Sequence, residues 1–184
     1  MARFRDTLGY RARPGFQVPR PRANCGLVMQ IRIINVAQKL PAWADLACED
    51  YLRRIPRELT PILVTVPLAA RRAKQSSAEP RKRESRAILD KLEAGSFNLA
   101  LDERGASWTS IDWSRNLERW MHEQGRVNLI IGGPDGLAPE CLQSCQQRVS
   151  LGKMTMPHAL VKVVLLEQLY RAWTIIQGHP YHRD

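Results

Sequence analysis

Short apolar runs alternate along the chain with longer segments in which apolar residues recur every three or four positions. The short runs predict strands over 30–37, 62–66, 97–102, 127–131 and 148–151. The longer segments predict helices over 41–55, 81–92, 109–123, 139–147 and 158–177. This alternation is typical of an α/β domain with a mostly parallel sheet and helices on both faces.

The predicted strand at 127–131 ends in the loop Gly132-Gly133-Pro134-Asp135-Gly136. Loops at the carboxyl ends of parallel strands converge on ligands, and adjacent glycines let a ligand approach the backbone closely. The loop matches neither a phosphate-binding P-loop nor the dinucleotide fingerprint, which argues against a ligand held by its phosphates. The alternative is a tight turn that only reverses the chain. A second loop of this kind, 152–157, follows the strand at 148–151.

The last predicted helix, 158–177, is apolar on nearly every side. A helix of this kind must be buried on every side. One sheet face cannot cover it, so we predict a homodimer in which a second subunit does. The tail after this helix, 179–184, contains two histidines, a tyrosine and an arginine. It is either a frayed terminus or part of a site.

Residues 1–28 contain six arginines and one aspartate, and have neither a strand nor a helix period. We interpret them as a disordered extension, translated ahead of a start at Met29, and residues 29–184 as a single domain. A transit-like peptide and an RNA-binding arm are the alternatives. The extension carries +5 of the chain's net charge of +10, which leaves +5 for the domain.

The charge of the domain is concentrated in residues 71–91, where eight lysines and arginines face three acidic residues. Such a run is usually a solvated face, but this one holds the whole excess charge of the domain, which favours contact with a nucleic-acid backbone. The candidate RNA-binding side chains here are Arg71, Arg72, Lys74, Arg81, Lys82 and Arg83.

The four cysteines show neither metal-ligand nor disulfide spacing, and no metal site is expected. The longest apolar segment, 157–177, is interrupted by Lys162, Glu167 and Arg171, so no membrane span is expected. Without a secretory signal, the chain is interpreted as a cytoplasmic protein with free thiols.

Four motifs occur together in the second half of the chain: Leu-Ile-Ile-Gly-Gly-Pro-Asp-Gly-Leu at 129–137, Ser-Leu-Gly-Lys-Met-Thr-Met-Pro-His at 150–158, Glu-Gln-Leu-Tyr-Arg-Ala-Trp at 167–173 and His-Pro-Tyr-His-Arg-Asp at 179–184. They resemble the bacterial large-subunit ribosomal RNA pseudouridine N3-methyltransferases, the smallest type of SPOUT methyltransferase. The resemblance covers 29–184 and leaves out residues 1–28.

This resemblance implies an α/β fold with a C-terminal trefoil knot, in which S-adenosylmethionine binds, and a homodimer. It also implies methylation of N3 of a pseudouridine in helix 69 of 23S rRNA, on assembled ribosomes. Carried over by position, the residues that contact the cofactor are Leu101, Gly132, Gly133, Leu151, Gly152, Lys153, Met154, Thr155 and Met156.

The N3 atom of pseudouridine is an imide nitrogen that carries a proton, so its methylation calls for a general base or a well-placed cation. The candidates are His158, Glu167, Arg171 and His182. We favour Arg171 for stabilising the base and a tail histidine for handling the proton. The alternatives are purely structural roles: His158 helps the helix start, and Glu167 and Arg171 form an ordinary ion pair four positions apart. His179, Tyr181 and Arg183 are further RNA-binding candidates.

Two other functions stay open at this point. One is a ribosome-binding or assembly factor without chemistry, which would have no reason to keep two loops suited to S-adenosylmethionine. The other is a SPOUT methyltransferase with a different RNA target, against which only the resemblance of the tail argues.

Overall fold

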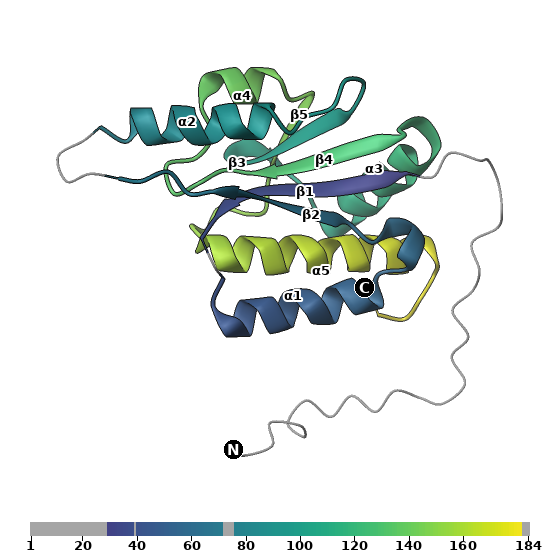
Figure 1. Ribbon diagram of the computed structural model, residues 1–184. Coiled ribbons are helices and arrows are strands. Elements are labelled where there is room, and N and C mark those ends of the chain that lie inside the picture. Colours follow the sequence, from purple (N-terminus) through teal and green to yellow (C-terminus); the bar gives the residue numbers. More distant parts are fainter. Residues whose placement is uncertain (1–28, 39, 72–75, 182–184) are drawn as a thin grey trace, which may run out of the picture.

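The computed structural model describes residues 29–38, 40–71 and 76–181, which form a parallel sheet between two layers of helices (Figure 1). The predicted extension 1–28 and the candidates Arg72, Lys74, His182 and Arg183 lie outside the described residues. The strands are β1 (Gln30–Ala37), β2 (Ile62–Pro67), β3 (Phe97–Ser107), β4 (Arg126–Ile131) and β5 (Gln147–Ser150). Their order across the sheet is β2-β1-β4-β3-β5, with every neighbouring pair parallel. The predicted α/β class, a mostly parallel sheet with helices on both faces, is confirmed.

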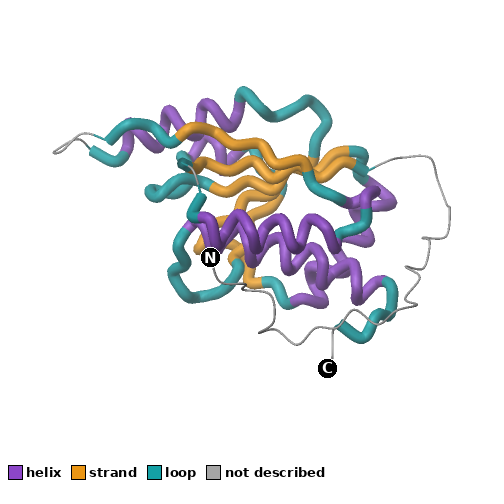
Figure 2. The backbone as a smooth tube through the Cα atoms, turned by 60° about the horizontal axis from the view of Figure 1, so that its bottom comes forward, coloured by secondary structure: helices purple, strands orange, loops and turns teal. Residues whose placement is uncertain are grey.

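The helices cover both faces of the sheet, as Figures 1 and 2 show from two directions. They are α1 (Ala42–Arg54), α2 (Ala78–Leu89), α3 (Ser110–Glu123), α4 (Pro139–Gln143) and α5 (His158–Ile176), with a short 3-10 helix, η1 (Arg57–Leu59). Alternate strand residues feed two cores, because successive side chains point to opposite faces. Ile33 and Leu129 pack under α1, α3 and α5, whereas Ile34 and Ile130 pack under α2 and α4.

Helix α3 begins with a reciprocal cap between Thr109 and Asp112. The backbone N–H of Asp112 donates to Thr109 Oγ1 (3.2 Å), and the Thr109 N–H donates to Asp112 Oδ2 (2.9 Å). This capping box satisfies two amide groups that have no partner inside the helix. The cap aims the buried side chains of Trp113, Leu117 and Trp120 at the sheet.

The capping box predicts a pH-dependent stability difference between the wild type and an Asp112→Asn variant. Hydrogen bonds from Thr109 hold the pKa of Asp112 below its ordinary value. The stabilisation that the ionised Asp112 carboxylate gives the folded state is therefore fully present above the unfolded-state pKa of about 4. It is lost as the pH falls through the lower folded-state pKa. We expect the variant to be less stable at pH 7, with the difference closing below about pH 4. Urea unfolding at several pH values measures it; a gap that is constant with pH would contradict the assignment.

Four predicted boundaries are wrong. Helix α2 ends at Leu89 instead of 92, because the chain leaves the helix in a turn at Asp90 and Lys91. Helix α2 begins at Ala78 instead of 81, because Pro80 falls in its first turn, where a missing N–H costs nothing. Strand β3 continues to Ser107, since Leu101 and Ala106 both pair with Val149 and the residues between them bulge out. Helix α4 ends at Gln143 instead of 147, because Gln146 is drawn onto the sheet by hydrogen bonds with Asn98 (2.9 and 2.7 Å).

Candidate functional site

A cavity of about 820 Å³ opens at the carboxyl ends of β3, β4 and β5. This volume is within the range of sites that hold a small-molecule cofactor. The predicted cofactor-binding residues all line it: Leu101, Gly132, Gly133, Leu151, Gly152, Lys153, Met154, Thr155 and Met156. The structure therefore brings together residues that are up to 55 positions apart in sequence, while their contact with a cofactor stays a prediction.

The glycine loop after β4 is a tight turn and a wall of the cavity at the same time. The Gly136 N–H donates to the Gly133 carbonyl (2.8 Å), and Gly136 adopts φ +74°, a backbone conformation that favours glycine. A Cβ atom on Gly132 would lie 2.8 Å from the backbone of Gly136. The two alternatives for this loop, a turn and a ligand-binding loop, are thus compatible.

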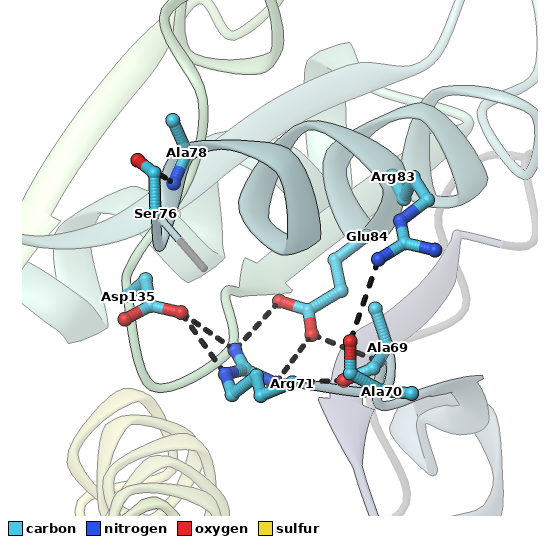
Figure 3. A network of polar contacts seen from close by, with 8 residues as sticks. All are labelled: Ala69, Ala70, Arg71, Ser76, Ala78, Arg83, Glu84 and Asp135. Carbon is cyan, nitrogen blue, oxygen red and sulfur yellow. Dashed lines mark hydrogen bonds and ion pairs between the residues drawn. The ribbon is translucent and has the colours of Figure 1, made fainter. Parts of the chain in front are cut away.

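Glu84 of α2 anchors the glycine loop through Arg71 (Figure 3). The Glu84 carboxylate is almost fully buried and accepts hydrogen bonds from the Ala69 N–H (2.9 Å) and from Arg71 Nη1 (3.0 Å). The same guanidinium donates from Nη2 to Asp135 of the loop (2.8 Å). Desolvation lowers the pKa of Arg71, but the hydrogen bonds that its guanidinium donates to Asp135 and Glu84 outweigh this effect and raise the pKa above its ordinary value. The network therefore ties together the segment after β2, helix α2 and the glycine loop.

This network explains why glycine is needed at position 133. A Cβ atom there would overlap the carboxylate of Glu84 and press on Val36. Sequence reasoning missed Glu84 because it lies within a run of cations. The signal was present in its spacing, since Pro80, Glu84 and Ile88 recur every four positions and form the buried stripe of α2.

Arg71, a predicted RNA contact, thus belongs to an internal network. Arg81 lines the cavity, and its Nε atom is buried without a hydrogen-bond partner among the described residues. Lys82 and Arg83 are exposed on α2, and Arg83 donates to the Ala70 carbonyl (3.4 Å). Contact of these side chains with RNA stays a prediction.

His158 begins α5 at the edge of the cavity. Partial burial lowers the pKa of its imidazole below the ordinary value, against the opposing effect of Glu84. The lowered pKa favours the neutral imidazole, which can accept a proton, in addition to its place in the first turn of the helix.

Glu167 and Arg171 form a separate cluster far along α5. Arg171 Nε donates to Glu167 Oε1 (2.8 Å), and Tyr181 Oη donates to the same oxygen (3.3 Å). The guanidinium lies over the Tyr181 ring, 4.7 Å from its centroid. The hydrogen bond with Glu167 raises the pKa of Arg171, and burial raises that of Tyr181. Thus Arg171 carries a fixed positive charge.

Thirteen residues separate Arg171 from His158, which is about 20 Å along a helix. The structure of this single chain therefore does not bring Arg171 and His158 together. His179 lies beside the Arg171 cluster, where its Nδ1 accepts a hydrogen bond from the Tyr181 N–H (3.1 Å).

Within the part of the chain that the structure describes, no three potential metal ligands cluster. None of the described helices has the length and apolar character to cross a bilayer.

Solved structures share this architecture. A probable methyltransferase from Bordetella pertussis Tohama I has a TM-score of 0.53 at 17% identity, over 79% of this chain and 95% of that one. A probable methylase family protein from Haemophilus influenzae Rd KW20 has a TM-score of 0.50 at 9% identity, over 85% of this chain and 72% of that one. At these identities the likeness concerns the α/β fold alone.

The chain belongs to the SPOUT methyltransferase family. The family profile described as "Predicted SPOUT methyltransferase" matches residues 29–182. The chain is similar to ribosomal RNA large subunit methyltransferase H of Hahella chejuensis, with 42% identity over 159 residues, 85% of this chain and all of that protein. It is 40% identical to the protein of the same name from Ectopseudomonas mendocina, over 84% of this chain and all of that protein.

Proposed function

We propose that this chain methylates N3 of a pseudouridine in helix 69 of 23S rRNA, with S-adenosylmethionine as methyl donor, and that it does so as a homodimer on assembled ribosomes. The observation that carries the proposal is the cavity between the glycine loop and the 151–156 loop. This chain is 40–42% identical to these relatives over their full length. Their common name, ribosomal RNA large subunit methyltransferase H, supports a ribosomal RNA substrate.

The residues around the cavity fit S-adenosylmethionine. Leu101, Ile131 and Leu137 give it apolar walls, while the loops contribute backbone polar groups of the kind that bind an adenosine. Arg81 lines the cavity, and its guanidinium is the candidate partner for the carboxylate of the cofactor. When bound, the cofactor supplies a methyl group already activated by its sulfonium.

The residues of the chain must then position the RNA base and manage the proton on N3. A bound methyl donor and base held in line account for much of such a rate acceleration. Arg171, held by Glu167 and Tyr181, presents a positive charge that stabilises the imide anion as it forms. We assign the proton to His182, with the neutral His158 as the candidate at the cavity itself.

A homodimer resolves the separation of about 20 Å between Arg171 and the cavity, because α5 of a second subunit can present its Arg171 there. The outer surface of α1 and α5 supports this arrangement, since Trp43, Leu46 and Leu160 are exposed large apolar side chains. The trefoil knot stays a prediction.

The proposal is tested by incubating the protein with radiolabelled S-adenosylmethionine and with ribosomes from a strain that lacks the modification. Nuclease digestion and mass spectrometry then locate the label, which we expect on a pseudouridine of helix 69. Label on another nucleotide would show that the protein is an RNA methyltransferase with a different target. Cofactor binding without methyl transfer to any RNA would overturn the reaction, and ribosome binding without cofactor binding would favour an assembly factor.

A further inference from the structure

A second cavity, of about 390 Å³, lies at the carboxyl ends of β1 and β2. Asn35 and Thr65, which are paired in register, form its floor, Asp45 of α1 forms one side, and Lys162 of α5 forms the other. It is separate from the first cavity, although Asn35 is also in register with Ile131, which lines that cavity. None of the proposed steps uses these four side chains.

Two polar side chains in this second cavity are buried. Lys162 is 6% exposed and lines the cavity, and among the described residues its charge acts on the thiol of Cys48. Asn35 is 4% exposed, and its Oδ1 atom has no hydrogen-bond partner in the described part of the chain. Burial without a partner is costly for both an ammonium and an amide. Two such groups in one cavity indicate a ligand that pairs with them.

The mixture of groups narrows the chemistry of that ligand. Lys162 offers only donors, Asp45 offers only acceptors when ionised, and the amide of Asn35 can offer either. A simple anion would face the Asp45 carboxylate, and a simple cation would face the Lys162 ammonium. A neutral group with N–H and C=O side by side satisfies all three residues. The imide edge of uracil or pseudouridine is such a group, and single-stranded RNA bases are commonly read on these edges by side chains.

The second cavity is also placed where RNA would pass. Val161 lines the first cavity and Lys162 the second, so that the first turns of α5 separate the two. A helix with its side chains is about 10–12 Å across, which is too far for one base to occupy both cavities. A second nucleotide of the same RNA strand can therefore enter one cavity while the first enters the other.

We propose that the cavity between Asn35, Asp45, Thr65 and Lys162 binds a second, unstacked base of the RNA substrate, of the uracil type. This proposal rests on the proposed function, because it takes RNA as the substrate. The site contributes RNA affinity and sequence preference, and takes no part in the proton transfer.

Lys162→Met and Asn35→Leu test this site, because both replace a buried polar group with an apolar one of similar size. We expect each to raise the KM for RNA about tenfold, with little change in kcat or in the Kd for S-adenosylmethionine. Thermal unfolding midpoints should be kept or raised, since a buried polar group is removed. Arg57→Met, which removes an exposed charge from η1 at the opposite end of β2, is the matched control.

Crosslinking separates this proposal from the proposed function. A helix 69 hairpin with 4-thiouridine at each uridine position in turn is irradiated with the wild-type protein, and crosslinked peptides are identified by mass spectrometry. Crosslinks at Gln38 or Thr65 that disappear in Lys162→Met support the site, even where the hairpin is not methylated. The proposed base-binding site would be overturned by crosslinks confined to the first cavity or by an unchanged KM for RNA in both variants. It would also be overturned if the two substitutions only weakened a dimer.

Discussion

Arg171→Met is expected to lower methyl transfer about 100- to 1,000-fold, because the guanidinium is the fixed positive charge that stabilises the imide anion. Methionine keeps the length and the apolar part of the side chain but removes the hydrogen bond to Glu167 and the charge over Tyr181. Cofactor affinity should change little, since Arg171 is assigned to the RNA base and does not line the cavity within its own subunit.

Single-turnover methylation and calorimetric titration with S-adenosylmethionine measure these two quantities. Arg115→Met serves as the control, because Arg115 is an exposed arginine of α3. Mixing Arg171→Met with a cofactor-deficient Gly133→Ala variant extends the test. If the partner supplies Arg171, random exchange of subunits restores about a quarter of the wild-type activity, as half of the dimers then hold one intact site. Full activity of Arg171→Met alone would remove the proposed role.

Arg71→Met is expected to destabilise the fold by about 2–4 kcal/mol, which is a large part of the stability of an ordinary domain. Among the described residues, the buried Glu84 carboxylate keeps only the hydrogen bond from the Ala69 N–H once Arg71 is gone, and a buried charge without its partner is costly. The cofactor should also bind more weakly, because Asp135 loses the contact that fixes the glycine loop.

Urea unfolding of the wild type and the variant measures the first effect, and titration with the cofactor measures the second. Arg86→Met provides a comparison within the same helix, since Arg86 pairs with Asp90 on an exposed surface and should cost less than about 0.5 kcal/mol. Equal losses for Arg71→Met and Arg86→Met would show that burial of Glu84 contributes nothing to the network.

The sequence was sufficient to predict elements whose apolar residues follow one period without interruption. Strand β1 and helix α3 were predicted at or within one residue of their observed bounds, because alternating or buried apolar residues and the Thr109 cap define them locally. The loops that converge on the cavity were also predicted, since the carboxyl ends of parallel strands share one edge of the sheet.

The features that could not be predicted from the sequence depend on contacts between segments that are distant along the chain. The bulge in β3 exists because β5, more than 40 residues later, pairs with both sides of it. Glu84 carries a charge that the sequence places on the surface, and only Arg71 and Ala69 make its burial tolerable. Lys162 interrupts an apolar helix, and its position in a second cavity depends on β1, β2 and α1 together.

The pairing of β1 with β4 also affects how the chain emerges during synthesis. All strands are parallel, and the central partner of β1 begins 89 residues after β1 ends. At a synthesis rate of about 5–20 residues per second, β1 waits about 5–20 s before that partner exists. During this interval its apolar side chains and one row of backbone groups are unprotected, so the nascent chain passes through an aggregation-prone stage that the finished protein no longer shows.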